Sequence, residues 1–478
     1  MARDALSKRS ATRADLIKPQ QRLGQGRPGR SWAWCSPVMF VLLFAVAGCR
    51  PASSTTADLR PSPRADAVTG LLQGGSDGFA VADRPPAMQF PRDHLPHPQY
   101  RTEWWYFTGH LQAADGRQFG FQYTVFRQAL RPPGGVSAQV PGGASAWRTD
   151  TAWLAHLALT DIQLGEHAGH ARIARGSMGL GGLVSPAAGP AQQTVSAEPS
   201  RAHAMPGNFA LVVDGWRMQR SADGAFLIQA DSADGAFLIQ AESADGAFLS
   251  QAASADADDS RAPAGANTES GDIGLRLRLV PVSEPVLHGR QGWSRKGPSS
   301  ASYYYSIPRW QVAGAVRTTA GEWVQVRGDG WLDREWSTSA LAPEQVGWDW
   351  FSLRLGQDQD GRDRALMLFR LRRSDGRRDA FDSGTLVTGN VAQALTGDDF
   401  ALTPVEFWQD EAGRRWPVRW TLTLRKPALR LEIRAVLADQ LMRVGLVYWE
   451  GAVNVDGDAK GRGYLEMTGY TAVADRAD

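Results

Sequence analysis

Cysteine is almost missing from this chain of 478 residues, and neither sign of charge predominates. The two cysteines, Cys35 and Cys49, both lie near the N-terminus, so the sequence cannot build a disulfide scaffold. The 52 basic residues are nearly balanced by 50 acidic ones, which gives no support to a protein that binds a nucleic-acid polyanion. Residues 1–31 hold eight basic and two acidic residues, so the remainder, with 44 basic and 48 acidic residues, has a formal charge of −4.

The motifs of several enzyme classes are also missing. The sequence has no glycine-rich phosphate loop, no G-x-S-x-G nucleophile elbow and no Cys–His arrangement. It has only eight histidines, of which His94-x-x-His97 and His167-x-x-His170 have the spacing of metal ligands. Neither pair has a third ligand nearby, so we predict no metal site and no cofactor.

The N-terminus has the pattern of a targeting signal. Residues 31–49 carry no charge, follow a basic stretch and are short for a spanning helix, which needs roughly 20 apolar residues. The ending Val46-Ala47-Gly48-Cys49 resembles the lipobox of bacterial lipoproteins. The resemblance implies a signal peptide over 1–49, lipidation of Cys49 and a membrane-anchored protein that faces the periplasm. An uncleaved anchor with a chance cysteine is the alternative. Residues 50–88, rich in proline, serine and alanine, predict a flexible linker.

Aromatic and turn-forming residues dominate the rest of the chain. Of the 18 tryptophans, 16 lie after residue 49, and the chain has 51 glycines and 27 prolines. Hydrophobic residues alternate with period two over segments such as 119–127, 364–371 and 418–425. No long amphipathic helix is indicated. We therefore predict an all-β fold of short antiparallel strands.

The chain contains a diverged internal duplication. Aromatic, hydroxyl, glycine and acidic residues recur in the same order in two distant units. The matching segments are 104–111 with 348–355, 305–314 with 448–457, and 328–333 with 461–466.

Each unit is expected to form a small antiparallel β-barrel. The N-terminal domain is predicted over 89–340 and the C-terminal domain over 345–474, where eight strands can be counted. The first and last strands are the best-marked elements of both units, so we predict that they pair and close each barrel. An open sandwich with a similar number of strands is the alternative.

The first unit is longer because it carries an insertion at about 176–270. Within it, SADGAFLIQAD (221–231) recurs twice more with a period of 11 residues. One copy is expected to form a strand beside 273–281, and the others a protruding loop. The stretch 176–207 is likewise predicted to be a loop.

The segment Trp331-Leu332-Asp333-Arg334-Glu335-Trp336 carries the clearest chemical signal. On a strand, Trp331, Asp333 and Glu335 share one face. If that face lines the barrel, burial beside an indole raises the pKa of the Asp333 carboxyl and prepares it to act as a general acid. The alternative is a structural ion pair of Asp333 with Arg334 and neighbours such as Arg309.

Tryptophan and tyrosine side chains on neighbouring strands supply candidate ligand contacts. They either fill the cores or line an apolar pocket that has a few polar groups. The candidate ligand-binding residues are Trp104, Tyr106, Tyr305, Trp336, Trp348 and Trp350, and Tyr304 joins the candidate catalytic group.

Six ordered segments resemble the AttH-like family, which is related to hydroxyneurosporene synthase, a carotenoid 1,2-hydratase. The likeness covers about 90–474 apart from the repeat insertion, and it implies two lipocalin-like barrels in tandem. The segments are FPRDHLPHPQYRTEWWYFTGHL (90–111), LHGRQGWSRKG (287–297), YYYSIPRW (303–310), GWLDREWS (330–337), GWDWFSLRL (347–355) and YWEGAVNVDGDAKGRGYLEMTGY (448–470).

The resemblance also implies a chemistry. In the hydratases an aspartate protonates a terminal alkene and water captures the cation; their aromatic-x-Asp pattern matches Trp331-Leu332-Asp333 here. A His-x-Trp pair of the hydratases falls near Tyr304 and Ser306, so that pair is missing from this chain.

Two functions follow from these patterns. The first is a lipid-anchored periplasmic protein that binds a hydrophobic, lipid- or isoprenoid-like molecule and serves an ABC transporter permease. The second is a carotenoid 1,2-hydratase-like lyase that uses Asp333 as its acid. A purely structural envelope lipoprotein is a third reading, for which the sequence offers no specific feature.

Overall fold

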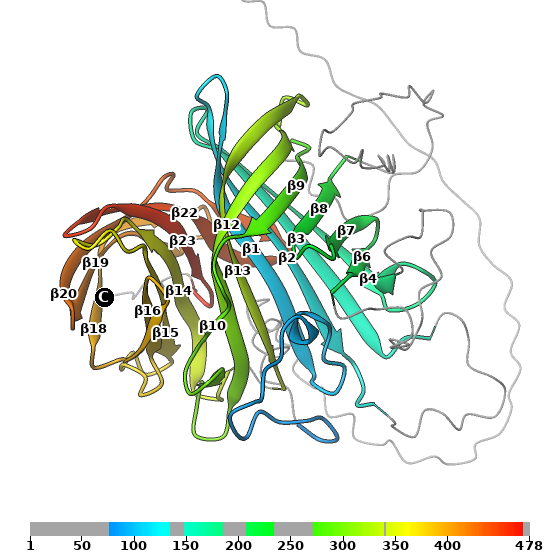
Figure 1. Cartoon of the computed structure of the whole chain (residues 1–478), viewed down its shortest axis with the longest axis horizontal. Helices are drawn as coiled ribbons and strands as arrows, with labels where there is room; N and C mark the ends of the chain where they lie inside the picture. Colours follow the sequence, from blue (N-terminus) through cyan, green and yellow to red (C-terminus); the bar gives the residue numbers. More distant parts are fainter. Residues whose placement is uncertain (1–75, 134–147, 185–206, 234–270, 339–340, 472–478) are drawn as a thin grey trace, which may run out of the picture. The chain divides into compact units, whose positions relative to one another are not determined.

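The computed structural model describes residues 76–133, 148–184, 207–233, 271–338 and 341–471, all of which belong to one compact unit. As predicted, the fold is all-β: the described residues form two antiparallel sheets, consistent with tandem lipocalin-like barrels (Figure 1). Within this part of the chain the only helix is the short 3-10 helix η1, Arg92–His94. None of these segments is a helix long and apolar enough to span a membrane.

The first sheet has 13 strands, with the order β4-β3-β2-β1-β13-β12-β9-β8-β7-β6-β5 and with β10 and β11 paired to β12. The strands are β1 Thr102–Ala113, β2 Gln118–Ala129, β3 Thr151–Asp161, β4 Glu166–Arg175, β5 Gly181–Val184, β6 Phe209–Val213, β7 Trp216–Arg220, β8 Phe226–Asp231, β9 Gly274–Pro281, β10 Val286–Leu287, β11 Trp293–Arg295, β12 Ala301–Arg317 and β13 Trp323–Ser337.

The second sheet has ten strands, with the order β17-β16-β15-β14-β23-β22-β20-β19-β18 and with β21 paired to β22. The sequence predicted eight; it missed β17, which is mostly exposed, and did not separate β21 from β22, because only Gly445 lies between them. The strands are β14 Gln345–Leu355, β15 Arg364–Arg373, β16 Ser383–Thr388, β17 Val391–Thr396, β18 Phe400–Gln409, β19 Arg415–Arg425, β20 Ala428–Ala435, β21 Leu441–Val444, β22 Leu446–Gly457 and β23 Gly461–Met467.

The first and last long strands of each sheet are neighbours, as predicted. β1 pairs with β13, and β14 pairs with β23, both antiparallel. The matched segments occupy equivalent register: Tyr106 lies opposite Asp333 in the first sheet, and Trp350 lies opposite Glu466 in the second. Both sheets therefore use the same strand pairing at corresponding residues.

Glycine permits the close approach of these paired strands. A Cβ atom at Gly461 would overlap the Arg354 carbonyl oxygen, and one at Gly328 would overlap that of His110. We expect Gly461→Ala to lower the free energy of unfolding by about 1–3 kcal/mol, because the backbone must shift to admit the methyl group. Urea unfolding measures the effect. The control is Gly207→Ala, where the nearest atom is a side-chain nitrogen 3.8 Å away; equal losses in both variants would contradict the explanation.

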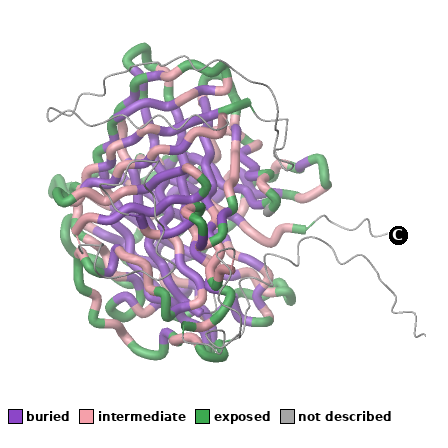
Figure 2. Tube along the Cα trace, turned by 90° about the vertical axis from the view of Figure 1, so that its right-hand side faces the viewer, coloured by how far each residue is buried: buried purple, intermediate pink, exposed green. Residues whose placement is uncertain are grey.

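Three clusters of buried side chains account for most of the apolar packing. One face of the first sheet forms a large core that includes Trp105, Phe107 and Trp310. One face of the second sheet forms another core around Trp416 and Trp420. The third cluster combines side chains from both sheets, so the opposite faces of the two sheets pack against each other. Figure 2 shows the buried positions running through the strands.

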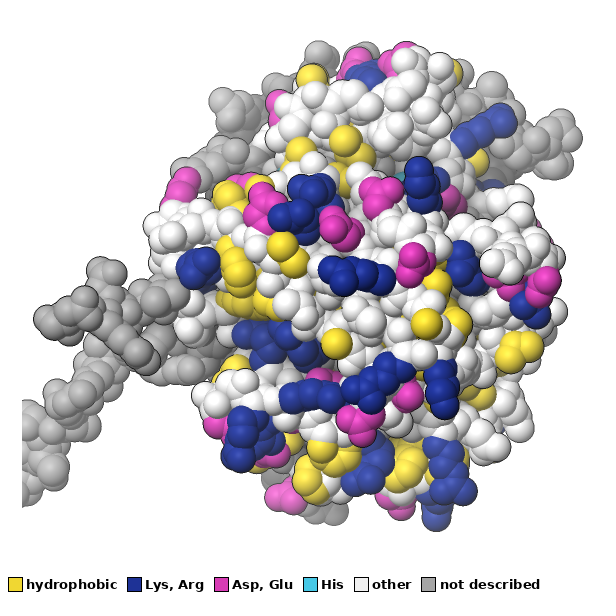
Figure 3. Space-filling model, turned by 90° about the vertical axis from the view of Figure 1, so that its left-hand side faces the viewer, with side chains coloured by type: hydrophobic (Ala, Val, Ile, Leu, Met, Phe, Trp, Pro, Cys, Tyr) yellow, Lys and Arg dark blue, Asp and Glu magenta, His cyan; other side chains and the backbone are white. Residues whose placement is uncertain are grey.

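The outer side of β18, β19 and β20 is polar. Arg419 lies 3.2 Å from Glu406, and Arg434 lies 3.7 Å from the same carboxylate. Figure 3 shows basic and acidic side chains interspersed on the face that it views, with scattered hydrophobic ones. Along β20, charged residues alternate with leucine and isoleucine, so one side of the strand is exposed and the other is buried.

The insertion contributes strands as well as loops. The first repeat copy supplies β8, which pairs with β9 as predicted, and Phe226 is fully buried. The loop prediction for 176–207 is wrong at β5, because Gly181–Val184 pairs with β6. The remaining copies, apart from Ser232 and Ala233 at the start of the second, lie outside the described residues, as do Cys49 and most of the predicted linker. The end of that linker packs on the first sheet, where Ala82 is buried and its carbonyl accepts the Trp293 indole N–H at 2.8 Å.

Candidate functional site

Asp333 lies between the two sheets. Trp331, Asp333 and Glu335 share one face of β13, as the alternation predicted, but that face does not line the first barrel. Leu332 and Trp336, on the other face, belong to the first core, whereas Trp331 packs with side chains of the second sheet. The prediction of the facing direction was wrong because each face of β13 combines apolar and charged residues and both are buried, so alternation does not distinguish them.

The Asp333 carboxylate accepts three hydrogen bonds. The Trp331 indole Nε1 donates to Oδ1 at 2.6 Å. The Ser306 hydroxyl also donates to Oδ1, and the Tyr304 hydroxyl donates to Oδ2. Tyr304 and Ser306 sit on β12 directly beside β13, and alternation places both hydroxyls on the face of Asp333.

Burial raises the pKa of the Asp333 carboxyl to about 7. The hydrogen bonds from Ser306, Tyr304 and Trp331 oppose this rise because they stabilise the ionised form, and the charge of Glu335 adds to it. The carboxyl therefore changes its protonation near neutral pH, which is the property that a general acid needs.

His288, which the sequence analysis did not single out, extends this network. Its Nε2 lies 2.6 Å from the Ser306 hydroxyl, and its Nδ1 lies 2.9 Å from the Thr385 hydroxyl on β16. Since Ser306 donates to Asp333, it accepts from Nε2–H, and Nδ1 accepts from Thr385. Burial first, and then the charge of Lys296, lowers the pKa of His288 to about 3, so the imidazole is neutral. No short spacing links His288 to Asp333, so only the fold could reveal the contact.

Side chains of β1 and of the second sheet complete the surroundings of Asp333. The Trp350 indole donates to the Tyr304 hydroxyl at 2.9 Å. Tyr106 packs edge-on against Trp350 with ring centroids 5.1 Å apart. Trp104 and Trp348 are only partly buried at the border of the same cluster. Four of the predicted ligand-binding residues, Trp104, Tyr106, Trp348 and Trp350, therefore gather near the acid.

A buried lysine neutralises the second carboxylate of β13. The Lys296 ammonium lies 3.5 Å from Glu335 and 3.7 Å from the centroid of the Phe369 ring. Burial lowers the pKa of Lys296, while the charges of Glu335 and Asp333 oppose that change. Glu335 therefore pairs with a cation that sequence analysis did not identify, and Asp333 remains the carboxyl without a cationic partner in its hydrogen-bond shell.

Two glutamates of the second sheet were also missed. Glu450 on β22 and Glu466 on β23 lie directly opposite each other. The Trp348 indole donates to Glu466 at 3.1 Å. The matching of 328–333 with 461–466 aligns Glu466 with Asp333, and this was the signal that could have identified it.

Two other predicted ligand contacts lie elsewhere. Tyr305 and Trp336 point into the first core, away from Asp333, because strand alternation turns them to the opposite face. Tyr305 bonds the His94 imidazole at 2.6 Å, and Trp336 stacks on His97 at 3.9 Å. They therefore do not share the face of Asp333 and Trp350, and their contact with a ligand stays a prediction.

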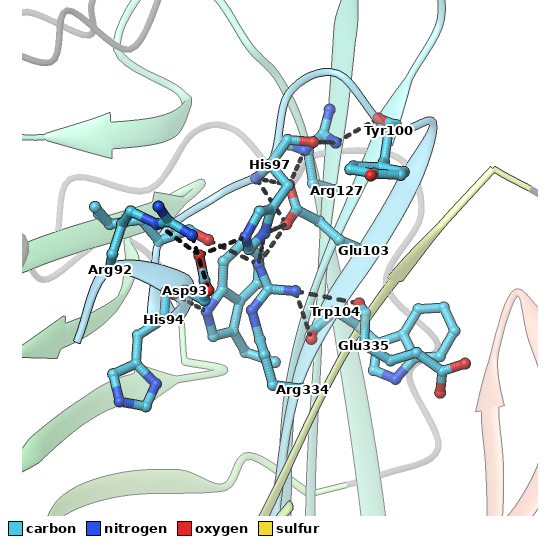
Figure 4. A network of polar contacts seen from close by, with 12 residues as sticks. Arg92, Asp93, His94, His97, Tyr100, Glu103, Trp104, Arg127, Arg334 and Glu335 are labelled. Carbon is cyan, nitrogen blue, oxygen red and sulfur yellow. Dashed lines mark hydrogen bonds and ion pairs between the residues drawn. The ribbon is translucent and has the colours of Figure 1, made fainter. Parts of the chain in front are cut away.

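The alternative prediction, an ion pair of Asp333 with Arg334 and neighbours such as Arg309, is also wrong. Arg334 binds Glu103, which in turn binds Arg127, in the buried network shown in Figure 4. Arg309 pairs with Asp363. Among the residues that the structure describes, no group of three or more His, Cys, Asp or Glu side chains is arranged to hold a metal ion.

Tyr304→Phe tests the hydrogen bonding of Asp333. Loss of the phenolic donor removes a contact that stabilises the ionised carboxylate, so the pKa of Asp333 should rise further. A hydrogen bond to a charged group contributes about 1.5–3 kcal/mol, which corresponds to about 1–2 pH units. In a pH–rate profile of a reaction that needs the protonated Asp333 carboxyl, the pH above which the rate falls should therefore rise by that amount. Tyr303→Phe, in the first core, is the control; a limb that stays in place or moves down would argue against the assignment.

The fold and this cluster define a protein built of two lipocalin-like barrels with a buried carboxylic acid among aromatic rings where the two sheets pack together. A family model described as AttH-like matches residues 81–256 and 241–470. The chain belongs to the AttH-like family.

One solved structure supports this membership, and a second is only a distant likeness. A putative AttH from Nitrosomonas europaea is 31% identical, with a TM-score of 0.59, and the match covers 82% of this chain and all of that one. Kievitone hydratase from Nectria haematococca is 12% identical, with a TM-score of 0.48 over 82% of this chain and 96% of the other. No curated protein matches the sequence significantly.

Proposed function

We propose that this protein adds water to a carbon–carbon double bond of an apolar, acyclic isoprenoid such as a carotenoid, with Asp333 as the general acid. The observation that carries the proposal is the Asp333 carboxyl itself. It is 3% exposed, lies among aromatic rings of both sheets and titrates near neutral pH.

The reaction follows from these surroundings. Asp333 transfers its proton to one alkene carbon, and the π electrons form the new C–H bond. The neighbouring carbon becomes a cation, which the faces of Trp331, Tyr304 and Trp350 can stabilise. A water molecule then forms the C–O bond, and the proton that it releases returns to the ionised Asp333 carboxylate, which yields a tertiary alcohol and restores the acid.

The test is incubation of the protein with lycopene or neurosporene in membranes, with mass spectrometry of the extracted pigments. Wild type should form a product that has gained one water, and Asp333→Asn should not. Equal hydration by both proteins would dismiss Asp333 as the acid, and no product from either would count against acyclic carotenoids as substrates.

Binding without catalysis is the second candidate. The large side chains of both barrel cores, including Trp105, Trp310 and Trp420, favour a hydrophobic ligand between the sheets rather than inside a barrel. In this proposal the protein is anchored through Cys49 on the periplasmic side of a bacterial membrane and presents its ligand to an ABC transporter permease. Native mass spectrometry of protein from membranes should show a bound lipid that Trp350→Ala releases; an empty wild-type protein would contradict it.

A further inference from the structure

His288 lies directly beside the strand that carries the two hydroxyl donors to the acid. It follows β10, and its backbone N–H donates to the Tyr304 carbonyl at 3.1 Å, while the Tyr304 N–H donates to the Gly292 carbonyl at 2.9 Å. Gly289 lets the chain turn sharply here, since it has a φ of +62° and a Cβ atom on it would overlap the Trp293 carbonyl oxygen. The turn is therefore fastened to β12 at both of its ends, and this fixes the position of the imidazole.

The imidazole joins a chain of hydrogen bonds that runs from the second sheet to the acid. Thr385, on β16, lies 2.9 Å from Nδ1, and the Ser306 hydroxyl, on β12, lies 2.6 Å from Nε2. Ser306 in turn bonds Oδ1 of Asp333. All four side chains are buried, so bulk water does not compete for these bonds.

The ionised carboxylate sets the direction of these bonds. A carboxylate can only accept, so Ser306 must donate its single hydrogen to Asp333. The Ser306 oxygen can then only accept from His288, which requires the imidazole hydrogen to be on Nε2. His288 is neutral, because burial and then the charge of Lys296 lower its pKa to about 3, so Nδ1 is left to accept from Thr385.

The remaining neighbours of Asp333 act on it by other routes. Among the residues that the structure describes, the Ser306 hydroxyl bonds only His288 and Asp333. The His288 ring also packs on the ring of Tyr304, with centroids 4.3 Å apart, and a test must separate this contact from the bond to Ser306. The other charged and titratable groups that face Asp333 are Glu335 on its own strand, Lys296 after β11, Tyr304 on β12, Tyr106 opposite it on β1, and Glu466 on β23.

We propose that His288 is a positioning residue for the acid: its Nε2–H holds the Ser306 hydroxyl in the orientation that donates to Asp333. This inference rests on the hydration proposed above. Protonation of the alkene leaves Asp333 as a carboxylate, and a hydrogen bond that stabilises this charge makes the proton easier to release. Without the imidazole the Ser306 hydroxyl is free to turn away, and Asp333 holds its proton more tightly.

Two amide variants test this role, because they differ in which neighbour they reach. In His288→Gln the side-chain nitrogen takes the place of Nε2 and can donate to Ser306, whereas the shorter amide of His288→Asn reaches only the place of Nδ1. The C=O stretch of protonated Asp333 is identified by its loss in Asp333→Asn. Its titration midpoint should rise in His288→Asn by about 0.3–0.6 of a pH unit, since the hydrogen bonds of a chain strengthen one another. His288→Gln should restore the wild-type midpoint.

Ser306→Ala supplies the reference for a full loss of the donor, and it should raise the midpoint by about 1–2 pH units. The double variant His288→Asn with Ser306→Ala should have the same midpoint as Ser306→Ala, because His288 acts only through the Ser306 hydroxyl. A further rise in the double variant, which packing on Tyr304 would cause, would overturn the proposal. So would an unchanged midpoint in His288→Asn, or equal shifts in the two amide variants.

The titration does not depend on turnover. If wild type forms no product from lycopene, hydration of this substrate fails, and the midpoints still decide the role of His288. Nitrogen NMR of protein labelled with ¹⁵N in the histidine rings observes the imidazole directly. Above the midpoint of Asp333 the His288 signals, identified by their loss in His288→Asn, should show the hydrogen on Nε2; a hydrogen on Nδ1 would overturn the proposal.

Discussion

Replacing Asp333 by asparagine should lower the rate of hydration by about 10²–10⁴-fold, because the variant has no proton to give to the alkene. The amide retains the shape of the carboxyl, and the Tyr304 and Ser306 hydroxyls can each accept or donate a hydrogen bond. The loss should therefore appear in the rate of product formation and not in the folded structure. Circular dichroism of the variant checks the fold, and product formation from lycopene measures the rate.

The same substitution should change how stability depends on pH. The folded pKa of Asp333 lies near 7, above its ordinary value of 3.8, so between these values the folded state binds more protons than the unfolded state. The wild-type free energy of unfolding should fall as pH rises through this window, by up to about 4 kcal/mol from this group. Urea unfolding at pH 4 and pH 8 should show that Asp333→Asn lacks this decline. Parallel pH dependence in both proteins would contradict the raised pKa.

Glu103→Gln should produce the largest loss of stability. The Glu103 side chain is fully buried and binds the guanidinium groups of Arg127 and Arg334, while the His97 backbone N–H donates to both carboxylate oxygens at 3.0 Å (Figure 4). Despite burial, the two arginines hold the pKa of Glu103 well below its usual range. A neutral amide would leave two buried cations without their counter-charge, which should lower the free energy of unfolding by about 3–5 kcal/mol.

Matched variants separate charge from packing in this network. Glu322→Gln removes an exposed carboxylate that binds Arg117, so its cost should be about 1 kcal/mol or less. The double variant Glu103→Leu with Arg334→Met removes two of the three buried charges and leaves Arg127 as the one cation without its counter-charge, so it should recover part of the loss. A cost for Glu103→Gln no larger than that of Glu322→Gln would show that the buried ion pairs contribute little.

Whether a residue of the candidate site could be predicted from the sequence depends on how far it lies along the chain from the residues that it contacts. Trp331, Asp333 and Glu335 could be grouped correctly, because period-two alternation is a local property of a strand. Tyr304 was reached through the family resemblance, and it does contact Asp333. His288 could not be found in this way, because its contact with Ser306 depends on how the β10–β11 connection folds back onto β12.

The amino-acid sequence by itself determined the all-β fold, the duplication and the pairing of first with last strands, since alternation, turn residues and repeated motifs are encoded along the chain. Only the tertiary structure decided which face of β13 meets the second sheet. Each face combines aromatic or aliphatic residues with charged ones, so the local pattern does not choose between them, and the packing of a partner sheet fixes the choice. That packing also left Tyr305 and Trp336 on the face away from the acid and brought Trp350 of the second sheet into contact with the Tyr304 hydroxyl.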